Sequence, residues 1–362
     1  MHRATSSLVG VGNVCGSAVS AVIVVMLLVL SSCGAGDGAG TVDPGSSPVV
    51  VSGPATEEIR FTSDGFEVVG DLRLPDGAGP YPAVIVVHGD GPQTRNSTPG
   101  TRTILEKFGA AGFAVLSWDK PGSGESTGEF DEGKTLRQRA AILADGVRYL
   151  AEHPAIDSDR IGFWGISQAG WVMPMALELT DDVAFMIVVS GGGEDSIEQL
   201  GYQLGQQLVC DGLSPDQGEL VSVNFPRVAK GHTYEDYMAA MDILVEIDGW
   251  EKFVGPAVLS EEDWQPWPPE IDAYFDPMTI IRQTVIPVLA VFGDMDRYVD
   301  PIQGAAAYEN ALEAAQNPNY HVELIPGVGH TMQNQGSMCS GGSTTSDRYL
   351  ELLDEWIVVL GR

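Results

Sequence analysis

The 362-residue sequence is short of basic residues, with 19 Lys and Arg against 50 Asp and Glu and a net charge of −31 at pH 7. A chain this acidic repels phosphate backbones and anionic headgroups, so we expect no nucleic-acid partner. The sequence also lacks the His-Glu-x-x-His, Walker and dinucleotide-binding glycine motifs, so we expect no metal and no other cofactor. Apolar residues still make up 44% of the chain, which is enough for a large core and excludes a disordered protein.

Long hydrophobic runs are equally scarce. The apolar run at residues 18–30 would span roughly 20 Å as a helix, short of the roughly 30 Å hydrocarbon core of a bilayer. We therefore expect residues 1–32 to be a cleaved secretory signal. The Leu-Ser-Ser-Cys sequence ending at Cys33 resembles the bacterial lipobox, which implies lipidation of Cys33 and an exported, membrane-anchored cell-envelope protein. The alternative is an ordinary cleaved signal, in which Cys33 has no such role.

Residues 33–56 consist largely of small and polar residues without periodicity, and we expect them to form a flexible linker before a folded body at residues 57–362. In an exported chain, Cys210 and Cys339 lie in an oxidising space. The sequence gives no distance between them, so a disulfide bond and two separate thiols both remain open.

Strand patterns alternate with helix patterns along most of the folded body. We expect strands at residues 58–62, 66–74, 83–87, 113–118, 161–164, 184–189, 287–292 and 321–325. We expect helices at residues 101–111, 136–152, 169–179, 301–315 and 346–360. An antiparallel entry followed by β-α alternation predicts an α/β fold with a mostly parallel central sheet and helices on both faces.

The alternation stops between about residues 194 and 281. This interval is too long for a simple crossover and, with Trp250, Trp264 and Trp267, too aromatic for a flexible linker. We therefore expect a mainly helical cap inserted into the sheet domain. An ordinary long surface excursion is the alternative.

The strand at 161–164 leads straight into a Gly-x-Ser-x-Ala turn around Ser167 and then into a helix. A sharp turn of this kind exposes a serine hydroxyl to a neighbouring base, and the helix N-terminus favours developing negative charge. Residues 124–128 match Gly-x-Ser-x-Gly letter for letter, but Ser126 lies in a polar loop with no helix after it. The local context therefore favours Ser167 over Ser126 as the nucleophile.

A serine nucleophile needs a base that is oriented by an acid. The strand at 287–292 is followed by Asp294, Asp296 and Asp300, and the strand at 321–325 is followed by His330. Open α/β sheets place their sites at the carboxyl ends of parallel strands, so these side chains are expected at the same edge as Ser167.

Together these motifs resemble the α/β-hydrolase superfamily over about residues 57–362, and within it the bacterial dienelactone-hydrolase-like and prolyl-oligopeptidase-like esterases. The likeness rests on five segments: His88-Gly89-Asp90-Gly91-Pro92, the loop at 119–126, Gly165-Ile166-Ser167-Gln168-Ala169-Gly170, Gly293-Asp294-Met295-Asp296 and Gly327-Val328-Gly329-His330. The chain order Ser, Asp, His is the order of that superfamily.

The resemblance implies a role for each of these residues. It places the acid at Asp296, with Asp294 and Asp300 as alternatives. It assigns the oxyanion hole to the backbone N–H groups of Gln168 and Asp90, with Gly89 or Gly91 as alternatives to Asp90. His88 and the 119–126 loop are then structural. The charge of Asp90 would oppose an oxyanion unless it is turned away or paired, for which Arg95 is a candidate.

The expected function is hydrolysis of a small-molecule carboxylic ester by Ser167, His330 and Asp296 through an acyl-enzyme. A serine peptidase or an acyl thioesterase would use the same triad. A surface lipoprotein that binds without catalysis is the non-enzymatic alternative. The sequence leaves open the natural substrate, the acyl chain length and the oligomeric state.

Overall fold

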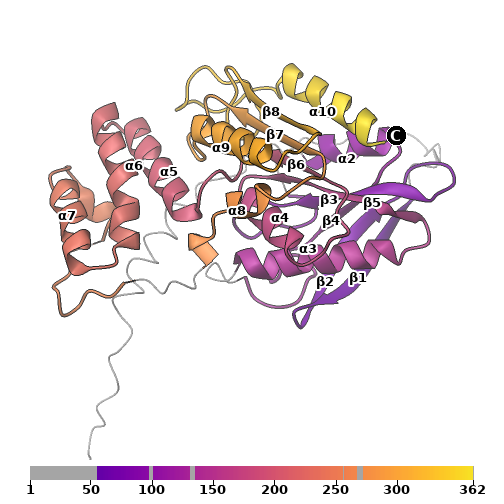
Figure 1. The fold of residues 1–362 in the computed structure, drawn as a ribbon, viewed down its shortest axis with the longest axis horizontal. Helices are drawn as coiled ribbons and strands as arrows, with labels where there is room; N and C mark the ends of the chain where they lie inside the picture. The colour runs from indigo at the N-terminus through magenta and orange to yellow at the C-terminus, as the bar shows by residue number, and fades with distance from the viewer. Residues whose placement is uncertain (1–54, 98–100, 131–134, 256, 267–271, 362) are drawn as a thin grey trace, which may run out of the picture.

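The structure is a computed structural model that describes residues 55–97, 101–130, 135–255, 257–266 and 272–361 (Figure 1). The expected signal segment, Cys33, nearly all of the expected linker and Trp267 lie outside the described residues. No helix in the described part of the chain is both long and apolar enough to cross a bilayer.

A single eight-stranded sheet forms the centre of the molecule. Its strands in chain order are β1 (Thr56–Ser63), β2 (Phe66–Arg73), β3 (Tyr81–Val87), β4 (Ala114–Trp118), β5 (Ile156–Ile166), β6 (Phe185–Val189), β7 (Val288–Gly293) and β8 (Tyr320–Ile325). Their order in the sheet is β1-β2-β4-β3-β5-β6-β7-β8. The β1–β2 and β2–β4 pairs are antiparallel, whereas all pairs from β4 to β8 are parallel.

Helices cover both faces of the sheet. They are α2 (Thr101–Ala110), α3 (Thr135–Ala151), α4 (Ala169–Leu177), α8 (Met278–Ile281), α9 (Pro301–Ala314) and α10 (Asp347–Leu360). In β3, Ala83, Ile85 and Val87 pack in the core shared with α3, α4, α8 and α9, whereas Val84 and Val86 pack in the core shared with α2 and α10. Successive strand side chains point to opposite faces, so a strand buried on both sides is continuously apolar.

The predicted mostly parallel α/β architecture is therefore confirmed. The largest difference in strand bounds is at β5, which begins at Ile156 rather than at residue 161. The extra residues include the exposed Ser158 and Asp159, so this part of the strand lacks the apolar pattern on which the prediction depended.

Between β6 and β7 the chain forms a helical insertion, residues 196–281. Besides α8 it contains α5 (Ser196–Cys210), α6 (Pro215–Lys230) and α7 (Tyr234–Leu244), which lie to one side of the sheet in Figure 1, and two short 3-10 helices, η2 (Trp250–Lys252) and η3 (Asp272–Tyr274). Helices α5, α6 and α7 share their own apolar core, which includes Leu204, Phe225 and Met241.

A disulfide bond joins Cys210, at the end of α5, to Cys339, 129 residues later in the chain. Cys339 lies between β8 and α10, so the bond ties the helical insertion to the segment that carries His330. The structure thus resolves a pairing that the sequence leaves open.

Candidate active site

Ser167 occupies the turn between β5 and α4. Its φ is +60°, in the left-handed region that a serine adopts only when the surrounding structure enforces it. Its N–H donates to Val189 O of the adjacent strand β6 at 2.9 Å. A Cβ on Gly165 would lie 2.5 Å from the Ala169 Cβ, so the alanine in this turn is accommodated because residue 165 is glycine.

The competing serine has a different environment. Ser126 is 8% exposed, and its hydroxyl donates to Asp119 O at 2.7 Å and accepts from Val69 N–H at 2.9 Å. The Asp119 carboxylate in turn accepts the N–H groups of Arg95 and Glu125. These bonds fasten the loop to β2, so the Ser126 hydroxyl has a structural role.

The Asp296 carboxylate hydrogen bonds to His330, which lies after the neighbouring strand β8. The distance from Asp296 Oδ2 to His330 Nδ1 is 2.8 Å, and Asp296 Oδ1 accepts the N–H groups of Tyr298 and Val299. Asp296 is completely buried and the His330 side chain is 12% exposed. A carboxylate only accepts, so Nδ1 donates the proton of this bond, and in the Nδ1–H tautomer Nε2 is an acceptor.

The two alternative acids have other partners. Asp294 accepts the N–H of Gly327, and Asp300 caps α9 by accepting the N–H groups of Ile302 and Gln303. Both carboxylates therefore hold backbone in place, whereas the Asp296 carboxylate is bonded to the imidazole.

The loop after β3 lies beside Ser167. A Cβ on Gly89 would be 3.7 Å from Ser167 Oγ, and Gln168 Nε2 donates to Asp90 Oδ1 at 2.8 Å. Within the described part of the chain, the N–H groups of Asp90 and Gln168 have no acceptor. Strands β3 and β5 are neighbours whose connections leave in opposite directions, and such a switch point is where open α/β sheets form their sites.

The Ser167 hydroxyl makes no hydrogen bond with any residue that the structure describes. The structure thus brings Asp296 together with His330, and Asp90 together with Gln168, but forms no bond between Ser167 and His330. In unliganded enzymes the catalytic hydrogen bonds are often long and tighten only when substrate is bound.

Comparison with known proteins places this site in a family. The family model for X-Pro dipeptidyl-peptidases (S15 family) matches residues 64–319, which include the Ser167 turn and Asp296. The chain belongs to the S15 family.

Curated relatives of this S15-family chain include several hydrolases. Thiohydrolase aneE of Aspergillus aculeatus is 32% identical over 114 residues, 31% of this chain and 34% of that protein. The 2,6-dihydropseudooxynicotine hydrolase of Paenarthrobacter nicotinovorans is 29% identical over 117 residues, 32% of this chain and 30% of that protein. The chain spans less than half the length of each of these two relatives.

Solved structures of similar fold cover more of the chain. An esterase of Pyrococcus furiosus, Pf2001, aligns with a TM-score of 0.55 at 16% identity, over 89% of this chain and 95% of that one. DcsB in complex with its substrate analogue aligns with a TM-score of 0.53 at 21% identity, over 85% and 99%. These neighbours confirm the α/β-hydrolase fold. The S15-family chain therefore has the fold of the α/β-hydrolases.

Two buried cations of the S15-family chain escaped the sequence analysis. Lys120, after β4, is fully buried and burial lowers its pKa well below the usual value. Arg139, on α3, is 1% exposed and burial lowers its pKa to about 10. The sequence does contain one signal for a buried Arg139. This arginine lies three residues after Leu136 and one before Ala140, on the apolar face of a predicted helix. His88, beside both cations, has its pKa lowered to about 3, chiefly by burial and further by Lys120.

The helical insertion contacts the acid turn. Tyr202 on α5 donates its hydroxyl to Asp296 O at 2.8 Å, and Gln199 Nε2 donates to Tyr298 O. Burial and the neighbouring carboxylates Asp300 and Asp296 raise the pKa of Tyr202, so its hydroxyl stays protonated and able to donate. Together with the Cys210–Cys339 disulfide, these bonds attach α5 to the segments that carry the acid and the imidazole.

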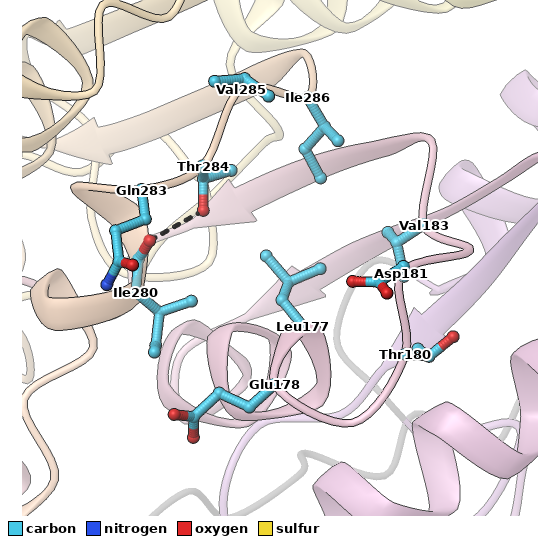
Figure 2. A pocket seen from close by; sticks show the side chains of 10 residues that line it. All are labelled: Leu177, Glu178, Thr180, Asp181, Val183, Ile280, Gln283, Thr284, Val285 and Ile286. Carbon is cyan, nitrogen blue, oxygen red and sulfur yellow. Dashed lines mark hydrogen bonds between the residues drawn. The ribbon is translucent and has the colours of Figure 1, made fainter.

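The pocket in Figure 2 lies elsewhere. It has a volume of about 460 Å³ and is lined by the end of α4, with Leu177, and by the segment before β7, with Thr284 and Ile286. These residues precede β6 and β7, at the amino ends of the parallel strands, whereas Ser167, Asp296 and His330 follow the carboxyl ends. The pocket therefore does not belong to the candidate active site. Among the described residues, no three His, Cys, Asp or Glu side chains gather closely enough to hold a metal ion.

Proposed function

We propose that this chain is a serine hydrolase that cleaves carboxylic esters through an acyl-enzyme. The observation that carries the proposal is the strained, unpaired Ser167 on the β5–α4 turn, with Gly89 beside its Oγ and a bonded Asp296–His330 pair at the same edge of the sheet. The exposed nucleophile turn and the acid–imidazole bond support the assignment of a Ser-His-Asp triad.

In the proposed reaction, His330 Nε2 takes the Ser167 proton while Oγ attacks the ester carbonyl. The N–H groups of Asp90 and Gln168 bind the resulting oxyanion, and Asp296 holds the imidazole in the tautomer with Nδ1–H. His330 then protonates the departing alcohol. Water, deprotonated by the same base, attacks the acyl-enzyme and releases the carboxylic acid and free Ser167.

Peptide hydrolysis is the second candidate, because the matching family model describes X-Pro dipeptidyl-peptidases. A dipeptidyl-peptidase needs a negative group for the free amino terminus of its substrate. Glu194 follows the Gly191–Gly193 loop next to Ser167 O, but burial and then Glu198 raise its pKa to about 8. A carboxyl that is mostly protonated at pH 7 is a poor partner for an ammonium group, which favours the ester.

Acyl thioesters are also within reach of the same triad, and one curated relative is named a thiohydrolase. A net charge of −31 disfavours polyanionic acyl carriers such as coenzyme A. Export as a lipid-anchored protein remains part of the proposal. It is supported by the disulfide, a bond typical of oxidising compartments.

Active-site labelling tests the proposal. The purified protein is treated with a fluorophosphonate probe and the modified peptide is mapped by mass spectrometry. We expect a single label on Ser167. The labelled and unlabelled proteins are then assayed with p-nitrophenyl acetate and butyrate, a butyryl thioester and Gly-Pro-p-nitroanilide. The expected order of kcat/KM places the esters first. Faster turnover of the anilide would establish the peptidase instead, and a protein without label or turnover would be the non-catalytic alternative.

A further inference from the structure

Two positive side chains lie buried under the loop that follows β3. Lys120 has no exposed surface and Arg139 is 1% exposed, and they reach this position from the segment after β4 and from α3, respectively. Moving a cation out of water is costly unless strong hydrogen bonds compensate for it. The contacts of the two side chains show what compensates for this cost.

In the described part of the chain, the side-chain hydrogen bonds of the two cations all go to the candidate oxyanion loop and to Gln168. Lys120 Nζ donates to Gly89 O and to Gly91 O, both at 2.6 Å. Arg139 donates through one terminal nitrogen to His88 O and through the other to Gln168 Oε1. Three backbone carbonyls of a five-residue loop are therefore held on cations.

The direction of these carbonyls determines the direction of the N–H groups. In a trans peptide the C=O of one residue and the N–H of the next point in opposite directions. With Gly89 O held on Lys120, the N–H of Asp90 points away from Lys120. Gly89 itself adjoins Ser167, with its Cβ position 3.7 Å from Oγ. In the described part of the chain neither this N–H nor that of Gln168 has an acceptor.

The cations also account for the carboxylate of Asp90 at this position. Burial lowers the pKa of both Lys120 and Arg139, and the negative charge of Asp90 partly opposes this lowering, so Asp90 lies close enough to interact with them. Its Oδ1 accepts from Gln168 Nε2, and Gln168 Oε1 accepts from Arg139. Arg95, the partner considered from the sequence, pairs instead with Asp71 and Glu125.

We propose that Lys120 and Arg139 are positioning residues that hold the loop carbonyls of residues 88, 89 and 91 inward and thereby aim the Asp90 N–H at the oxyanion formed on Ser167. The inference rests on the proposed function, because it assigns the machinery that prepares that oxyanion hole. Neither cation touches the substrate. Their effect passes through the backbone of the loop and through Gln168.

The test compares Lys120→Met, Arg139→Lys and Gln168→Ala with wild type on p-nitrophenyl butyrate. Lys120→Met removes both bonds to the loop, and we expect kcat to fall by about 10²-fold with KM within threefold, as for loss of an oxyanion donor. Arg139→Lys keeps the charge but not the two-pronged geometry, and Gln168→Ala removes only the side-chain bridge. For each of these two we expect about a 10-fold fall in kcat. Lys107→Met, at the exposed ion pair with Asp354, is the control and should leave kcat unchanged.

A second readout separates positioning from general destabilisation. An alkyl boronic acid forms a tetrahedral adduct with the serine, whose oxygen occupies the oxyanion site. Its affinity should fall in parallel with kcat, while thermal unfolding confirms that each variant is folded at the assay temperature. If Lys120→Met fails to fold, Arg139→Lys and Gln168→Ala decide the matter.

Folded variants that keep wild-type kcat and boronic-acid affinity would overturn this inference while leaving the proposed function intact. A wild-type protein without ester turnover or probe label would instead remove the proposed function.

Discussion

Two five-residue segments of this chain have almost the same sequence motif, yet they differ in hydrogen bonding and in backbone conformation. Residues 124–128 read Gly-x-Ser-x-Gly and residues 165–169 read Gly-x-Ser-x-Ala. The Ser126 hydroxyl donates one hydrogen bond and accepts another. In this segment the residues with positive φ are the glycines Gly124 and Gly128. The Ser167 hydroxyl has no partner in the described chain, and the serine itself takes the positive φ.

The two segments differ in hydrogen bonding and in backbone strain. In the Ser126 loop the buried hydroxyl is hydrogen bonded and glycines take the positive φ angles, and both features favour stability. The Ser167 turn lacks both features, and such departures persist at functional sites because the rest of the structure enforces them. The comparison predicts that substitutions in the first segment reduce stability and that substitutions in the second reduce activity.

The largest expected effect is that of Ser167→Ala. Loss of the nucleophile should reduce kcat on p-nitrophenyl butyrate by about 10⁴-fold or more. No folded-state hydrogen bond of the side chain is lost, so we expect the melting temperature to change by no more than about 2 °C. Steady-state kinetics and calorimetry on the same preparation measure both. Residual turnover above one per cent in pure protein would assign the chemistry to another residue.

The acid turn offers the same contrast on a smaller scale. Asp296→Asn should lower kcat by about 10³-fold to 10⁴-fold, because the amide no longer fixes the His330 tautomer. Asp294→Asn is the matched control, since that carboxylate accepts the Gly327 N–H and should affect chiefly stability. Equal losses of kcat in the two variants would contradict the assignment of Asp296 as the acid.

Ser126→Ala addresses the other side of the comparison. The substitution leaves Asp119 O and the N–H of Val69 without their partner in a buried site, at a cost of about 2–4 kcal/mol in unfolding free energy. Below the melting temperature, kcat should remain within about threefold of wild type. Denaturant unfolding beside the ester assay provides both numbers. A strong loss of kcat without loss of stability would mean that this loop takes part in catalysis.

Local patterns sufficed to predict the sheet and the turns of the site. The strand, turn and helix around Ser167 lie next to one another in the sequence, and so do the Gly-Asp-x-Asp turn and its strand. The partners of the oxyanion loop could not be predicted in this way. Lys120 meets Gly89 from 31 positions away, and Gln168 meets Asp90 from 78 positions away. The Cys210–Cys339 bond likewise depends on how the insertion packs, which no local pattern encodes.

The smallest expected effect concerns whether a buried carboxyl near Ser167 lowers the free energy of unfolding. Glu194 lies beyond the loop whose Gly191 abuts Ser167 O, and its pKa is raised from 4.5 to about 8, first by burial and then by Glu198. Between those two pH values the native state binds more protons than the unfolded chain, so the contribution of Glu194 to stability is full below pH 4.5 and is lost as the pH rises through 8.

Glu194→Gln removes this titration, and the variant should gain on wild type by about 2–3 kcal/mol in unfolding free energy between pH 6 and pH 9, at about 1.36 kcal/mol for each of the roughly two pH units below the folded pKa. Glu313→Gln on the exposed side of α9 is the control and should follow wild type at every pH. Parallel stability curves for wild type and Glu194→Gln would show that the titration of Glu194 does not change the free energy of unfolding. Diverging curves would show that a buried carboxyl near the Ser167 turn lowers the free energy of unfolding as the pH rises.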